Sequence, residues 1–95
     1  MIVGAARIVL LIPENMSLKG KRKVVKSIIQ RVRNTFNVSI AEIGDNDLWQ
    51  RAELGISTVG NDASFINSRL DKAINHIEEM NTAEILESEI EIIHL

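Results

Sequence analysis

Basic residues gather in one stretch of this chain, and no acidic residue interrupts them. Seven of the eleven Lys and Arg residues fall between Lys19 and Arg33, and no Asp or Glu occurs from Asn15 to Ala41. From Glu42 onward the sequence carries twelve acids against three basic residues, so a net charge of −2 conceals a segment of +7 and one of −9. Segregated charge of this kind favours a charged partner or a self-complementary contact over solubility alone.

Anion binding is the chemistry that the basic segment suits. At about 100° per residue, five of its cations fall within roughly 100° of arc on a helix, away from the apolar positions. These five are Lys19, Arg22, Lys23, Lys26 and Arg33. Cations in a first helical turn oppose the helix dipole at a cost of about 0.3 to 1 kcal/mol each, and such local conflicts tend to mark functional sites. We therefore expect a phosphate or nucleic-acid backbone to bind at six residues. They are Lys19, Lys21, Arg22, Lys23, Lys26 and Arg33.

Four interpretations of the basic segment stay open at this level. An RNA or a ribosomal subunit would be held through its phosphates, with strong salt dependence and little sequence discrimination. In a homodimer or other homo-oligomer, the basic helix of one copy would meet the acidic second half of another. An ordinary solvated helix surface is the third interpretation. The fourth is an enzyme that acts on a small anionic substrate at the helix start, Ser17 to Arg22, where no residue is an evident general base. Trp49 is the candidate for stacking on a base, although a single Trp beside a strand is more often a packing or dimer contact.

The sequence contains no pattern that is typical of a catalytic, cofactor or metal site. It has no cysteine, and therefore no disulfide, thiolate ligand or cysteine nucleophile. Neither of the two glycine-rich nucleotide-binding motifs occurs, and His76 and His94 lack a second ligand at a metal-binding spacing. We therefore expect a non-enzymatic protein without catalytic residues, cofactors or metal ligands.

Length and composition suit one domain with a single core over residues 1–95, because 45% of the residues are apolar and 25% are charged. No apolar run approaches the roughly 20 residues that a membrane span needs. The start of the chain also lacks a basic region followed by a cleavage site. We expect a cytoplasmic protein that has no membrane partner.

The first half of the sequence predicts a strand followed by a helix. Ile2 to Ile12 is almost wholly aliphatic and stops at Pro13, which cannot continue a ladder of hydrogen bonds. Ser17 is a suitable N-cap for a helix from about Leu18 to Thr35, where apolar residues recur at helical spacing.

The second half predicts a hairpin, a second helix and a last strand. Val38 to Ile43 and Leu48 to Val59 flank a Gly-Asp-Asn-Asp turn. Asp62 is a suitable N-cap for a helix through about Met80, and Glu84 to Leu95 alternates acidic and other residues with strand period. The order βαββαβ predicts an α+β ferredoxin-like domain, in which two helices cover one face of a four-stranded antiparallel sheet.

Three tracts together resemble a known family over essentially the whole chain: Ser17 to Arg22, Arg31 to Glu42 and Trp49 to Ala52. They are similar to the YlxP-like family of small bacterial proteins of unknown function. The resemblance implies a ferredoxin-like domain that dimerises, and a role in ribosome or RNA metabolism, because members are often encoded beside genes for translation initiation and ribosome-binding factors. The matching positions are Ser17, Leu18, Lys19, Lys21, Arg22, Arg33, Phe36, Asn37, Val38, Ser39, Ala41 and Glu42.

Some of these matching residues have an evident structural use. Phe36 and Val38 suit the core, and Asn37 suits the end of a helix because Asn tolerates the left-handed conformation. For Glu42 we expect an ion pair across the sheet, with Arg7 or Arg51.

Overall fold

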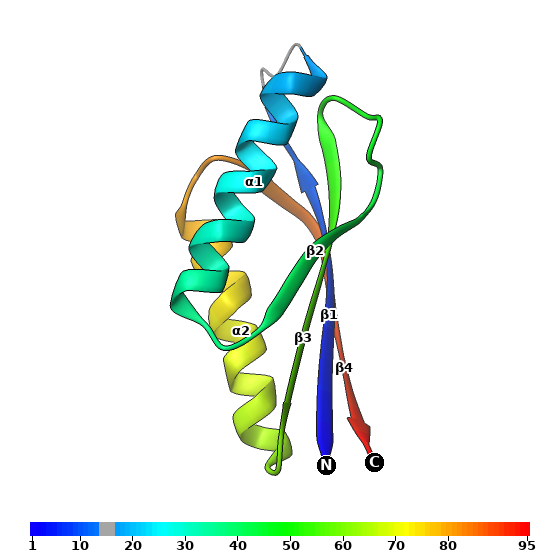
Figure 1. The fold of residues 1–95 in the computed structure, drawn as a ribbon, viewed down its shortest axis with the longest axis vertical. Coiled ribbons are helices and arrows are strands. Elements are labelled where there is room, and N and C mark those ends of the chain that lie inside the picture. Colours follow the sequence, from blue (N-terminus) through cyan, green and yellow to red (C-terminus); the bar gives the residue numbers. More distant parts are fainter. Residues whose placement is uncertain (14–16) are drawn as a thin grey trace.

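The computed structural model describes residues 1–13 and 17–95, and its elements follow the predicted order (Figure 1). They are β1 (Ile2–Leu11), α1 (Leu18–Thr35), β2 (Ser39–Gly44), β3 (Arg51–Gly60), α2 (Ala63–Glu79) and β4 (Glu84–His94). The strands form one sheet in the order β2-β3-β1-β4, and all three pairs are antiparallel. Both helices cover the same face (Figure 1), so the predicted ferredoxin-like α+β fold is confirmed and the other face carries no helix.

Both helices begin at the predicted caps. The Ser17 hydroxyl oxygen accepts a hydrogen bond from the Gly20 amide at 3.0 Å, and Asp62 Oδ1 accepts one from the Phe65 amide at 3.1 Å. Each cap satisfies one of the amides that the first helical turn leaves without a partner. Neither helix among residues 1–13 and 17–95 has the length and apolar content that crossing a bilayer requires.

The connection between β2 and β3 is longer than predicted. β3 begins at Arg51 rather than Leu48, because the turn continues past its polar cluster. Asp45 adopts a left-handed conformation with φ of 59°, and its carbonyl accepts a hydrogen bond from the Leu48 amide at 3.1 Å. Trp49, predicted at the start of a strand, therefore lies in the connection.

The core forms between the sheet and the two helices. Alternate residues of the strands point to the helix side, and the apolar stripe of each helix packs against them. The sheet contributes Ala6, Ile8, Leu10, Ile40, Ala52, Leu54 and Ile56. The helices contribute Val25, Ile28, Val32, Ile66, Leu70, Ala73, Ile74 and Ile77.

Gly4 in β1 lies directly under α2, with no room for a side chain. A Cβ atom on Gly4 would lie 2.4 Å from Cγ2 of Ile66 and 2.8 Å from Cδ1 of Leu70, both fully or almost fully buried. Since these side chains sit in the core, they have little room to move.

We expect Gly4→Ala to lower the free energy of unfolding by about 1 to 3 kcal/mol, because it overpacks the core under α2. Gly55→Ala is the matched control on the helix-free face, where the new Cβ would meet Ile43, a side chain that is 55% exposed and can move aside. Urea unfolding measures both variants. Equal losses at the two positions would contradict the packing described for Gly4.

Candidate functional site

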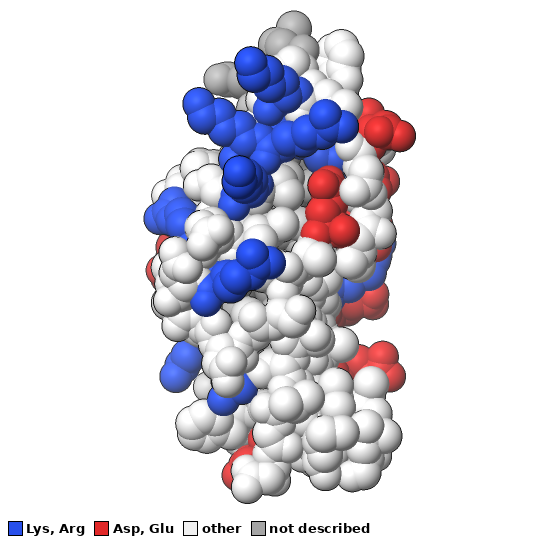
Figure 2. Space-filling view, in the orientation of Figure 1, with Lys and Arg blue, Asp and Glu red and all other residues white. Residues whose placement is uncertain are grey.

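The first helix presents a row of cations to solvent. Five of the six predicted anion-binding side chains are exposed, and Figure 2 shows Lys and Arg side chains gathered over the upper part of the helix side. These five residues, named here the basic face, are Lys19, Arg22, Lys23, Lys26 and Arg33.

Within residues 1–13 and 17–95, no carboxylate forms an ion pair with the basic face. Arg33 is held in place by a backbone group instead, because its Nη2 donates to the Ile40 carbonyl at 3.1 Å. Lys19 and Lys23 are four residues apart, as are Arg22 and Lys26. Like charges at this spacing destabilise a helix by about 0.2 to 0.5 kcal/mol per pair. A bound polyanion would relieve that repulsion.

Lys21, the sixth predicted residue, does not lie on this surface. Its side chain is 0% exposed, so the prediction that Lys21 contacts a phosphate does not fit its position. Lys21 precedes Val25, Ile28 and Val32 by four, seven and eleven residues, and therefore lies on the buried stripe of α1. An ammonium group in the core needs an anionic partner.

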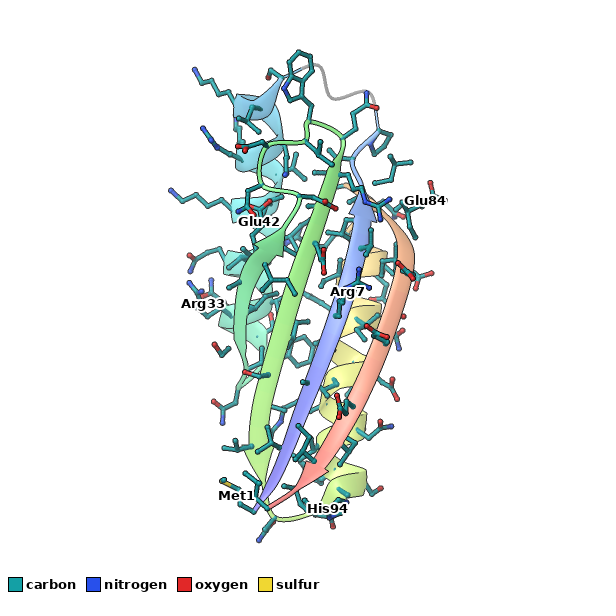
Figure 3. All side chains as sticks on the ribbon, turned by 90° about the vertical axis from the view of Figure 1, so that its right-hand side faces the viewer. Met1, Arg7, Arg33, Glu42, Glu84 and His94 are labelled. Carbon is teal, nitrogen blue, oxygen red and sulfur yellow. The ribbon has the colours of Figure 1, made fainter. Side chains whose placement is uncertain are left out.

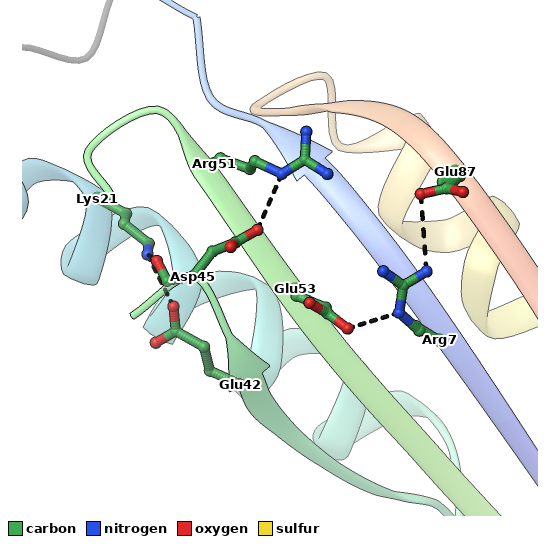
Figure 4. A network of polar contacts seen from close by, with 7 residues as sticks. All are labelled: Arg7, Lys21, Glu42, Asp45, Arg51, Glu53 and Glu87. Carbon is green, nitrogen blue, oxygen red and sulfur yellow. Dashed lines mark hydrogen bonds and ion pairs between the residues drawn. The ribbon is translucent and has the colours of Figure 1, made fainter. Parts of the chain in front are cut away.

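That partner is Glu42. Lys21 Nζ lies 2.9 Å from Glu42 Oε2 and also donates a hydrogen bond to the Asp45 carbonyl (Figure 4). Glu42 pairs with Leu54 in the β2–β3 register, so both residues face the helices. The predicted pairing of Glu42 with Arg7 or Arg51 is therefore wrong, because those two arginines lie on the other face. Figure 3 shows Glu42 and Arg33 along the β2 edge, toward α1.

The helix-free face of the sheet is acidic and is arranged around Arg7. Arg7 Nε donates to Glu53 Oε1 at 2.5 Å, and Nη1 lies 3.6 Å from a carboxylate oxygen of Glu87 and of Glu89. The hydrogen bond to Glu53 raises the pKa of Arg7 above its ordinary value, so the guanidinium stays charged. Nearby, Arg51 pairs with Asp45 at 2.9 Å (Figure 4).

A shallow groove of about 530 Å³ crosses this face. Two rows of residues that pair across the strands form the bottom of the groove, and most of their side chains are small. One row is Ser39, Ser57 and Ala5, and the other is Ala41, Gly55 and Arg7. The charged groups at its rim include Arg7, whose guanidinium already faces three carboxylates. The positive charge of Arg7 is therefore already neutralised, and the groove is a poor candidate for an anion-binding site.

A second cationic group lies on α2 and was not predicted from the sequence. It consists of Arg69 and Lys72 together with the aromatic ring of Phe65. Phe65 is 68% exposed, and the guanidinium carbon of Arg69 lies 6.0 Å from the centre of its ring. The sequence held a signal for Phe65, because it directly precedes Ile66, which belongs to the apolar stripe, and so points away from the core.

Trp49 and His76, which the sequence singled out, both contact other residues of the fold. Trp49 is 54% exposed and has contacts of its own in the β2–β3 connection. His76 packs against Phe36, with ring centres 5.6 Å apart and an interplanar angle of 75°. In the described part of the chain, no group of three or more metal-ligating side chains is placed to hold an ion.

We expect the two members of the buried pair to respond unequally to substitution. Glu42→Leu leaves the fully buried Lys21 ammonium without its carboxylate and should cost about 3 to 5 kcal/mol of unfolding free energy. Lys21→Met should cost less, because 19% of the Glu42 side chain is exposed although its Oε2 is buried, whereas Lys21 is fully buried. The double variant should recover most of the loss, since apolar residues then replace both charges. Strictly additive losses in urea unfolding would contradict the pairing.

Comparison with known proteins assigns the chain to a family. Residues 3–90 match the family described as "Protein of unknown function (DUF503)". The chain is 40% identical over 77 residues to "Uncharacterized protein YlxP" of Bacillus subtilis (strain 168), a match that covers 81% of this chain and 84% of the relative.

Solved structures with the same fold are distant in sequence. "De novo designed protein Foldit4" is 14% identical, with a TM-score of 0.54 over 100% of this chain and 99% of the design. "Structural Genomics, protein YJCS" is 10% identical, with a TM-score of 0.55 over 97% of this chain and 99% of that protein. These likenesses concern the fold alone. The family match and the relative agree with the resemblance found in the sequence, and the chain belongs to the DUF503 family of unknown function, together with YlxP.

Proposed function

We propose that this protein is a non-enzymatic RNA- or ribosome-associated binding protein whose basic face contacts phosphates. The observation that carries the proposal is a row of five exposed cations on one helix, with no carboxylate partner in residues 1–13 and 17–95. A phosphate backbone supplies a matching row of negative charge. A role in RNA or ribosome metabolism is also what the family's gene neighbourhood suggests, because members are often encoded beside genes for translation initiation and ribosome-binding factors.

The ion pair of Lys21 and Glu42 supports the proposal because it fixes the position of the helix that carries the basic face. Lys21 joins the first turn of α1 to Glu42 at the end of β2, so the exposed cations around it project from an anchored helix. Side chains on a fixed helix lose less freedom on binding than side chains on a mobile tail. The basic face would therefore read the spacing of phosphates rather than the identity of bases.

Charge complementarity also supports a second candidate, self-association. The basic face lies on the helix side, and carboxylates gather on the opposite side of the molecule (Figures 2 and 3). If α1 of one copy meets the sheet face of another, the contact uses two different surfaces. Such a heterologous contact produces rings or open chains, whereas a two-fold homodimer would need one self-complementary surface.

RNA binding by the intact protein should depend steeply on salt. With about 0.7 counterions released per phosphate contact on a single strand, five contacts predict a loss of roughly 100-fold in affinity between about 50 and 200 mM salt. Lys23→Gln combined with Lys26→Gln removes two contacts. We expect this variant to bind about tenfold or more weakly at the lowest salt and to lower the salt slope by about 1.4. Fluorescence anisotropy with short single-stranded RNAs, and sedimentation with small ribosomal subunits, measure both quantities.

The matched control lowers the net charge by the same two units away from α1. Ser57→Asp combined with Ser88→Asp does so at exposed positions on β3 and β4. If this control weakens binding as much as the Lys23 and Lys26 variant, net charge rather than the basic face governs affinity. Absence of RNA and subunit binding at the lowest salt, with salt-sensitive association in light scattering, would replace the proposal with the self-association candidate.

A further inference from the structure

A small hollow lies where the end of α1 meets the first three turns of α2. Its volume is about 200 Å³, and it is lined by one residue after α1 and four residues of α2. The lining residues are Phe36, Phe65, Ser68, Arg69 and Lys72. None of these five is acidic, so the hollow combines two aromatic rings, a hydroxyl and two cations.

Phe65 is the exposed wall of this hollow. Its side chain is 68% exposed, whereas the next residue, Ile66, is 1% exposed and belongs to the core. The ring therefore contributes little to folding by burial. An exposed aromatic face beside cations is the arrangement that binds single-stranded nucleic acids, because every base has a π-face that stacks on such a ring.

Arg69 is held in position for a ligand. Its Nη1 donates to the Thr58 hydroxyl at 2.7 Å, and that hydroxyl donates to the Asn37 carbonyl at 2.9 Å. Thr58 is only 7% exposed, so the anchor is buried. A guanidinium has five N–H groups, and this anchor uses one of them. The guanidinium carbon lies over the Phe65 ring, 6.0 Å from the ring centre, so the cation and the ring are held together.

Lys72 adds a second cation one helical turn after Arg69, and it is exposed. The hollow also continues the surface of α1, because Phe36 is the residue at which that helix ends. Figure 2 shows cations on the same side of the molecule below those of the first turns of α1. A strand that follows the basic face along α1 would therefore reach the hollow at the end of the helix, about 25 Å from Lys19 at 1.5 Å per residue.

We propose that this hollow binds one unpaired nucleotide of an RNA, with the base stacked on Phe65 and the adjoining phosphate held by Arg69 and Lys72. This inference rests on the proposed function and adds to it a contact that the basic face cannot supply, because phosphates carry no information about whether a base is stacked or paired. It also gives the protein a preference for single-stranded over double-stranded RNA.

The test is a cycle of two proteins against two RNAs. Wild type and Phe65→Leu are each titrated by fluorescence anisotropy with a single-stranded RNA and with an abasic strand of the same length and charge. Phe65→Leu should bind the normal RNA about 5-fold to 100-fold more weakly, which is the range of one base stacked on one aromatic ring. It should bind the abasic strand as wild type does, with an unchanged salt slope.

Control variants separate the possible failures. Leu86→Ala removes another exposed apolar side chain, 46% exposed on β4, and should leave both affinities unchanged. Phe65→Leu should also keep the wild-type unfolding midpoint, because the ring is in solvent. If wild type binds RNA and the Lys23 and Lys26 variant weakens it, while Phe65→Leu changes nothing, the hollow is not a nucleotide site and the proposed function stands. Equal loss on normal and abasic RNA would overturn the stacking role. Absence of RNA binding by wild type would overturn both proposals.

Discussion

One buried ion pair fixes where the start of α1 meets the end of β2. Lys21 is fully buried, and leaving its ammonium unpaired in the core costs about 3 to 5 kcal/mol, a large part of the roughly 5 to 15 kcal/mol by which a domain is stable. Glu42 and the Asp45 carbonyl meet that demand, so the first turn of α1, the end of β2 and the turn that follows must come together. Asp45 in turn pairs with Arg51 at the start of β3. The geometry of the exposed cations on α1 is a consequence of this anchor, because the neighbours of Lys21 can only point outward.

Charge is distributed unequally over the two sides of the sheet, although the helix side also carries exposed acids in α2, at Asp71, Glu78 and Glu79. Helices cover one face, and their outer surface carries the basic face and the Phe65 hollow, whereas the uncovered face collects carboxylates around Arg7 (Figures 2 and 3). A polyanion that approaches the helix side is attracted there and repelled from the other side. The same separation explains why a contact between the basic face and the acidic face of another copy would join unlike surfaces and would not close as a two-fold dimer. The proposed RNA binding and the self-association candidate would therefore use the same cations.

Periodicity in the sequence was sufficient for the fold but not for every member of the site. Both helices begin at the predicted caps, since Ser17 and Asp62 each precede an apolar stripe of helical period. Lys21 shares that period with Val25, Ile28 and Val32, yet its charge led us to place it at the surface. Strand alternation also puts Glu42 on the side of Ile40, facing α1, so the predicted pairing of Glu42 with Arg7 or Arg51 was wrong because it overlooked this alternation. The hollow could not be predicted in this way, because Phe36 and Phe65 become neighbours only when α1 packs beside α2.

The most direct test of the account is a map of backbone amide chemical shifts for the labelled protein, recorded while single-stranded RNA is added at low salt. An interface on the helix side predicts changes along residues 19–33 of α1 and 65–72 of α2, with the amides of residues 87–91 in β4 unchanged. Changes concentrated in β4 and around Arg7, with α1 unaffected, would contradict the central claim that the uncompensated cations of α1 form the binding surface.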